Sequence, residues 1–238
     1  MSEIVSYTKT NAIAKIVMDD GKLNIMSSVM LRALSRAFDR AEQDNAIVIL
    51  TSGREGVFSA GFDTKILGRK DPHEIYDMVK LGAELAARVL SFRTPVITAC
   101  TGHAFPMGAF LLLASDIRIG ADGPYRIGLN EVAIGIAVPT FGLELARHRL
   151  VPAYLQRTAL TGEMFAPREA MTAGFLDQVV SPEQLQATAE TIAGALTKID
   201  LPSHASTKHR LRRLAVEAVR NAIDAEITVE GYQRRSEA

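Results

Sequence analysis

The chain has 238 residues, of which 47% are hydrophobic and 23% charged, a balance that is typical of a globular protein and excludes a disordered or collagen-like chain. Lysine plus arginine and aspartate plus glutamate each number 27, so the formal net charge is zero and a protein built to bind nucleic acid is disfavoured. A single cysteine, Cys100, excludes an intramolecular disulfide and a cysteine-based zinc site. We find no signal-peptide pattern after Met1 and no apolar run of about 18 residues, so we expect a cytoplasmic protein without a membrane partner.

Short β-branched runs predict the strands of the fold. They lie at 12–18, 46–51, 95–100, 116–120 and 177–180. The run AIVILT at 46–51 is apolar throughout, which suits a strand whose sheet is covered on both faces.

Apolar residues at helical spacing fill the intervals between these runs. They predict helices from Ser27 or Ser28 to about Gln43, from Asp71-Pro72 onward, and after Pro106. Beyond Ser181 no strand is expected, and two helices follow over 182–198 and 205–232. This order predicts an α/β fold with two parts: a core at 1–181, and a helical C-terminal subdomain at 182–238.

Two segments could present backbone N–H groups to a ligand. The first, GVFSAGFD at 56–63, is rich in small residues that let a ligand approach the backbone, although an ordinary tight turn has the same composition. The second starts with TGHAFPMG at 101–108, where Pro106 fits the first turn of a helix and the N–H of Met107 would be a free donor. One donor from each segment would form an oxyanion hole; the alternative is a buried core helix with a proline start.

Glu131 is a candidate general base. It lies among apolar residues, and burial there would raise its pKa toward neutrality, as a base working near pH 7 requires. The alternative is a surface glutamate on a loop.

The basic run KHRLRR at 208–213 is interpreted as the solvated face of a helix, or alternatively as a phosphate contact. The five histidines show no metal-ligand spacing, so no metal is expected.

Taken together, these segments resemble the crotonase, or enoyl-CoA hydratase/isomerase, superfamily over nearly the whole chain. The turn KLNIMS at 22–27 resembles the family's first CoA-contacting turn, and FSAGFD at 58–63 resembles its F-[SA]-A-G-x-D segment. The segment at 102–116 resembles its G-x-A-x-G-G-G-x-E…D segment. The resemblance implies that the N–H groups of Ala60 and Met107 form the oxyanion hole. It also implies substrate contacts from Lys22, Leu23, Ser59, Gly61, Phe62, Asp63 and Phe110.

The resemblance further implies the architecture and the partners. The family fold is a spiral of β-β-α turns with helices outside, assembled as trimers or dimers of trimers, so the C-terminal subdomain is expected to serve trimerisation. Coenzyme A arrives as part of the acyl-CoA substrate, and no separate cofactor is expected. The chain ends soon after Tyr232, short of the usual family tail, and Met107 replaces a glycine, which could narrow the acyl pocket.

The departures from the family pattern indicate the reaction. Hydratases use two glutamates that flank a water; the first falls on Phe110 and the second on Glu131. One carboxylate suits a proton shuttle from C2 to C4 of the acyl chain, which resembles the Δ3,Δ2-enoyl-CoA isomerases, and Phe110 would exclude water. Two alternatives stay open: another crotonase reaction on an unusual acyl-CoA, with hydration less favoured, and a catalytically silent acyl-CoA-binding protein.

Overall fold

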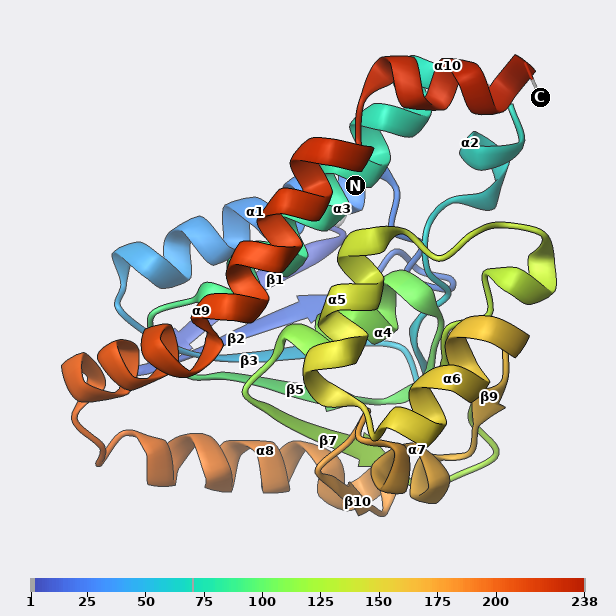
Figure 1. Cartoon of the computed structure of the whole chain (residues 1–238). Helices are drawn as coiled ribbons and strands as arrows, with labels where there is room; N and C mark the ends of the chain where they lie inside the picture. The colour runs from blue at the N-terminus through green and yellow to red at the C-terminus, as the bar shows by residue number, and fades with distance from the viewer. Residues whose placement is uncertain (1–2, 70, 238) are drawn as a thin grey trace.

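The computed structural model of the chain describes residues 3–69 and 71–237, with side chains up to residue 234 (Figure 1). In this part of the chain, a six-stranded sheet has the order β1-β2-β3-β5-β7-β10 and a four-stranded sheet the order β4-β6-β8-β9. The larger sheet contains β1 (Val5–Thr10), β2 (Ile13–Met18), β3 (Ile47–Ser52), β5 (Val96–Cys100), β7 (Ile117–Ala121) and β10 (Gln178–Val180). The smaller sheet contains β4 (Gly56–Ser59), β6 (Gly102–Ala104), β8 (Ile127–Gly128) and β9 (Met164–Phe165).

The two sheets grow together as a spiral. Each turn of the chain adds one strand to the larger sheet and the next to the smaller one: β3 then β4, β5 then β6, β7 then β8. Strands β3, β5, β7 and β10 pair in parallel, as do β4, β6 and β8, so helices connect one turn to the next. The expected α/β spiral of β-β-α turns is therefore confirmed.

Four of the expected helices are present with bounds close to the prediction. They are α1 (Ser28–Gln43), α3 (Pro72–Ser91), α4 (Pro106–Ala114) and α8 (Pro182–Leu196). In α1, Ser27 accepts a hydrogen bond from the N–H of Met30, which caps the helix, and residues such as Leu31, Leu34 and Phe38 form its buried face. The sequence analysis did not anticipate α2 (Thr64–Gly68), the 3-10 helix η1 (Val132–Ile134), α5 (Thr140–Arg149), α6 (Pro152–Thr161) or α7 (Pro167–Ala173).

The single helix expected over 205–232 is wrong. The structure has α9 (Leu201–Glu226), then a break, then α10 (Val229–Glu237). Asp200 caps the start of α9, four residues earlier than predicted, through a bond from the N–H of Ser203 to its carboxylate. At the break, the buried Ile227 leaves the helical conformation, and Thr228 accepts the N–H of Gly231 to start α10.

The larger sheet is covered on both faces, as the uniformly apolar β3 predicts. Alternate residues of β3 point to opposite sides: Val48 and Leu50 belong to the main core, whereas Ile47 and Ile49 pack with apolar residues of α8. In Figure 1, α8 runs along one face of this sheet, and α1, α3 and α9 lie on the other side. The C-terminal helices are thus packed against the core, α9 on α3 and α5, and α10 on α3.

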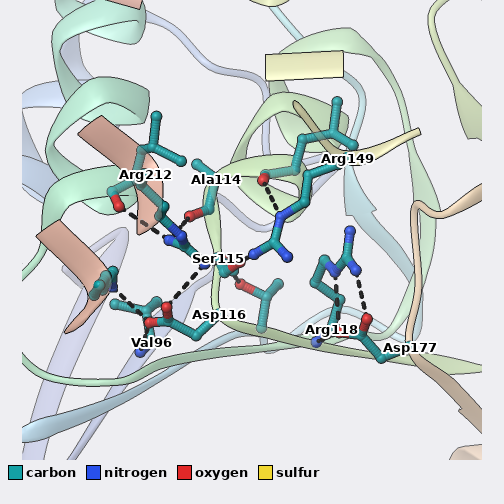
Figure 2. A network of polar contacts seen from close by, with 12 residues as sticks. Val96, Ala114, Ser115, Asp116, Arg118, Arg149, Asp177 and Arg212 are labelled. Carbon is teal, nitrogen blue, oxygen red and sulfur yellow. Dashed lines mark hydrogen bonds and ion pairs between the residues drawn. The ribbon is translucent and has the colours of Figure 1, made fainter. Parts of the chain in front are cut away.

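The basic run at 208–213 is only partly a solvated helix face. Lys208 and Arg212 are buried, and both pair with the carboxylate of Asp116, at 2.7 and 2.9 Å (Figure 2). His209 and Arg213, by contrast, are exposed. Two of these cations therefore belong to a buried network around Asp116. None of the helices in the described residues combines the length and apolar character needed to cross a bilayer.

Candidate active site

A cavity of about 210 Å³ opens between the loop after β4, helices α2 and α3, the start of α4, the segment 130–139 and helix α10. Its wall is mainly apolar, with a small number of polar groups. The lining residues are Ala60, Gly61, Phe62, Thr64, Leu67, Val79, Phe105, Pro106, Asn130, Glu131, Ile134, Ile136, Ala137, Pro139 and Tyr232. An apolar cleft with a few convergent polar groups is the usual form of a small-molecule site.

Glu131 supplies the carboxylate in this wall. Its side chain is buried, with 6% of the residue exposed, so the surface-loop alternative is wrong. Neither carboxylate oxygen has a hydrogen-bond partner within the part of the chain that the structure describes. Because burial disfavours the charged form, the pKa of Glu131 rises from 4.5 to about 7. A carboxylate with this pKa and two vacant oxygens can take up and return a proton near neutral pH.

The loop after β4 is tied to the start of α4 through Ser59. The carbonyl of Ser59 accepts the N–H of Phe105 at 2.9 Å. Its hydroxyl donates to the carbonyl of Asn24 at 2.7 Å and accepts the N–H of Gly61. Gly61 has φ +85°, and a Cβ there would lie 3.5 Å from the nitrogen of Pro106. Both small-residue segments singled out in the sequence therefore meet at the same wall of the cavity.

The two predicted oxyanion donors, Ala60 and Met107, differ in their hydrogen bonding. The N–H of Ala60 already donates to the carbonyl of Leu23 at 3.0 Å, so the structure gives it a partner within the chain. Across the described residues, no hydrogen bond is found for the N–H of Phe62 or for that of Met107. The ring of Phe62 and the sulfur of Met107 both lie against Gly82 of α3, which places these two residues side by side. Phe62 and Met107 are therefore two neighbouring residues whose N–H groups are available as donors.

The remaining predicted site residues fall into two groups. Gly61 and Phe62 line the cavity together with Ala60 and Glu131, as described above. The others lie outside its wall: Lys22 and Leu23 are exposed on the turn before α1, Ser59 and Met107 are fully buried, and Asp63 caps α2. The cavity wall thus brings together only part of the predicted set.

Phe110 also lies outside the cavity wall. It is fully buried on α4 and packs edge-on against Phe141 of α5, with ring centroids 5.2 Å apart. A Cβ at Gly142 would meet the same ring at 2.4 Å, so the phenyl group fills the space between the two helices. The position of the first hydratase glutamate is therefore part of the core in this chain.

Sequence reasoning missed Asn24 and Tyr232. Asn24 is fully buried with φ +49°, and its amide nitrogen donates to the carbonyl of Phe58 and to the hydroxyl of Ser52, so it fixes the strand that leads into the loop. Asparagine tolerates this left-handed conformation, and its place in the turn at 22–27 was the available signal. Tyr232 reaches the cavity from α10, and only the tertiary packing of that helix reveals it.

The spiral of β-β-α turns and this cavity define a protein of the crotonase class. The family model of enoyl-CoA hydratase/isomerase matches residues 8–237, and the chain belongs to this family. Human mitochondrial enoyl-CoA delta isomerase 1 is 33% identical in an alignment of 211 residues that covers 86% of this chain and 69% of the relative. Carnitinyl-CoA dehydratase of Salmonella typhi is 29% identical, over 82% of this chain and 75% of its own length.

Solved structures agree with this assignment. The apo structure of an enoyl-CoA isomerase of Mycobacterium tuberculosis superposes with a TM-score of 0.89 at 42% identity, over 94% of this chain and 97% of that one. Isomerases, hydratases and a dehydratase all occur among these relatives, so the comparisons show the family and not the reaction within it.

Proposed function

We propose that the protein is an isomerase that shifts the double bond of a 3-enoyl-CoA to the 2-trans position. The observation that supports this proposal is the single carboxylate of Glu131 in a mainly apolar wall, with a pKa of about 7. Addition of water needs one group to activate the water and another to protonate the α-carbon, and the position of the first hydratase glutamate holds the core residue Phe110.

The proton shuttle follows from these groups. The carboxylate of Glu131 takes the proton from C2, which breaks the C2–H bond and moves electron density into a dienolate on the thioester oxygen. The N–H groups of Phe62 and Met107 stabilise that oxygen, and donors of this kind contribute about 3 kcal/mol each in other enzymes. The protonated Glu131 then delivers the proton to C4. The double bond moves from C3–C4 to C2–C3, and no atom is gained or lost.

The environment of Glu131 favours return of the proton over exchange with water. Apolar side chains such as Ile134, Ile136 and Pro139 line the cavity together with Glu131, and Tyr232 reaches it from α10. A water-poor site also strengthens the hydrogen bonds to the developing oxyanion. The remaining expectations belong to the same proposal: an acyl-CoA substrate that brings its own coenzyme A, no further cofactor, a homotrimer or dimer of trimers, and a cytoplasmic location.

An ultraviolet assay tests the proposal. With 3-hexenoyl-CoA, conjugation to the 2-enoyl thioester raises the absorbance, and crotonyl-CoA offered separately reports hydration by a fall. We expect conjugation without hydration. Glu131→Gln should lower turnover by about 10²- to 10⁴-fold and leave acyl-CoA binding intact. Glu55→Gln, the same change on an exposed residue, serves as the control.

The other outcomes assign the alternatives. Hydration of crotonyl-CoA at a comparable rate would move the protein to the hydratases. Binding of acyl-CoA without any turnover would favour a silent binding protein. Full activity of Glu131→Gln would contradict the mechanism.

A further inference from the structure

Helix α4 is buried on every side, because all nine of its residues are inaccessible. The last carbonyl groups of a helix have no partner within it, and a buried helix end must find them elsewhere. Ser115 satisfies two of them: its hydroxyl donates to Leu111 at 2.8 Å, and its N–H donates to Leu112 at 3.0 Å. The hydroxyl of Thr98, 2.6 Å from that of Ser115, fixes the serine in turn.

The remaining carbonyl groups at the C-terminal end of α4 accept hydrogen bonds from two arginines on distant helices (Figure 2). Arg149, the last residue of α5, donates from Nε to the carbonyl of Leu113 at 3.2 Å and from Nη2 to that of Ser115. Arg212 of α9 donates from Nη1 to the carbonyl of Ala114 at 3.2 Å and from Nη2 to that of Ser115 at 3.3 Å. Each terminal carbonyl of α4 therefore has a donor, and two of the donors are cations.

The opposite end of α4 is left open. Phe105 precedes the helix and gives no side-chain cap, and Pro106 has no N–H. The N–H groups of Met107 and Gly108 have no hydrogen-bond partner among the described residues, although both residues are buried. The C-terminal end of α4 is thus fully hydrogen-bonded, and its N-terminal end has free N–H donors. Such a helix can bind a negatively charged atom at its N-terminus.

The charge around the C-terminal end is unbalanced. Four basic side chains and two carboxylates meet there, and the ion pairs join Arg118 to Asp177 and both Lys208 and Arg212 to Asp116. Arg149 bonds to carbonyl oxygens and to no carboxylate within 4 Å in the described chain. This buried excess of positive charge lies at the negative end of the helix dipole, and its field adds to that dipole at the free N–H groups.

We infer that Arg149 and Arg212 are positioning residues for the oxyanion hole and act on it through α4. They fix the axial position of the helix and compensate its negative end, so that the N–H of Met107 stays aimed at the thioester oxygen. This inference rests on the proposed function, because the oxygen it serves belongs to an acyl-CoA. Six to eight residues at about 1.5 Å each separate Met107 from the carbonyl groups that the arginines bind, and the guanidinium groups lie about 3 Å further on, so charge and donor are about 13 Å apart. At that distance in a protein interior, the loss of one charge should slow the reaction by about fivefold to tenfold.

Arg149 is the better residue to change, because its loss leaves no carboxylate without a partner. Arg149→Gln removes the charge, and Arg149→Lys keeps the charge but loses the two-pronged contact. Arg147→Gln is the matched control: the residue lies on the same helix, its side chain is 63% exposed, and it pairs with Glu144 near the surface. Each variant is assayed for kcat and KM with 3-hexenoyl-CoA, and for the absorption band of bound 2-hexenoyl-CoA.

The expected result separates positioning from mere support of the fold. Arg149→Gln should lower kcat about fivefold to tenfold with KM changed less than twofold, because the oxyanion develops only in the transition state. The red shift that the hydrogen-bonded carbonyl gives bound 2-hexenoyl-CoA should shrink. Arg149→Lys should recover part of the lost kcat and part of the red shift, and Arg147→Gln should match the wild type in both.

The inference is overturned if folded Arg149→Gln keeps the wild-type kcat and band, or if KM alone rises. It is also overturned if the wild type itself does not shift the band. If the wild type shifts the band but does not conjugate 3-hexenoyl-CoA, the proposed function fails while the band of the variants still decides the role of Arg149. Should Arg149→Gln not fold, Arg149→Lys decides instead, with an expected loss of about threefold in kcat and wild-type behaviour as the refuting result.

Discussion

Burial of the ionised Glu131 carboxylate without a hydrogen-bond partner lowers the free energy of unfolding by an amount that can be measured. A carboxylic acid with a raised pKa binds its proton more tightly in the folded state than in the unfolded state. Stability therefore falls as pH rises from 4.5 to 7, and the full penalty remains at higher pH. With a pKa of about 7 against 4.5, the ionisation of Glu131 costs the folded state about 0.8 kcal/mol at pH 5 and about 3.3 kcal/mol at pH 8.

Glu131→Gln removes this titration. The amide has its own cost in the apolar wall, but that cost does not depend on pH, and it cancels when two pH values are compared. Relative to the variant, the wild type should therefore lose about 2.5 kcal/mol of unfolding free energy between pH 5 and pH 8. In a chain of this size, that corresponds to about 5–10 °C in Tm.

Urea unfolding of both proteins at pH 5, 6, 7 and 8 measures the difference. Glu55→Gln, an exposed isosteric change, should follow the wild-type curve. Parallel curves for the wild type and Glu131→Gln would refute the reasoning, because they would show that the carboxylate ionises as easily in the folded protein as in the unfolded chain.

Three further predictions concern the same site. In pH profiles, kcat/KM should rise with pH and level off above about 7, since Glu131 must be ionised to accept a proton; a midpoint near 4.5 would contradict this. Gly82→Ala should destabilise the protein by about 1–3 kcal/mol in urea unfolding and lower kcat, because the new Cβ would lie 2.6 Å from the ring of Phe62. Gly194→Ala in α8, where the methyl group meets no atom, should instead stabilise by about 0.5–1 kcal/mol. Asn24→Ala should lose about 2–4 kcal/mol in urea unfolding, because it removes buried hydrogen bonds at a left-handed residue; a loss below about 1 kcal/mol would contradict this role.

The larger sheet could be predicted from the sequence because its strands carry a signal of their own. Runs such as 46–51 and 95–100 are apolar and β-branched, and both faces of the sheet are covered. The smaller sheet could not, because β8 and β9 are two residues long and have no measurable period. Their pairing is set by the spiral that carries them.

The candidate site, like the fold, could be predicted from the sequence only in part. Glu131 could be selected from the sequence as a carboxylate in an apolar segment, but its apolar neighbours Val132 and Ile134 are exposed, so its burial comes from the tertiary structure. The choice between Ala60 and Phe62 as donor could not, because it depends on a hydrogen bond from Ala60 to Leu23, which lies 37 positions earlier in the chain. Backbone donors leave no mark in the side-chain pattern, so their direction follows only from the tertiary structure.

The division of labour between backbone and side chains explains how this fold could change its reaction. In the proposed mechanism the oxyanion donors are N–H groups, so Met107 can stand where the family has a glycine and still present its donor. The acid–base groups are side chains, so a substitution at such a position adds or removes a proton-transfer step. Phe110 packs against Phe141 in place of the first glutamate, and the proposed mechanism therefore requires Glu131 both to take the proton and to return it. A single base can do so only if its two protonation states are close in free energy at the working pH, and a pKa of about 7 meets this condition. The burial that destabilises the folded protein is thus the same feature that makes a one-carboxylate proton shuttle workable.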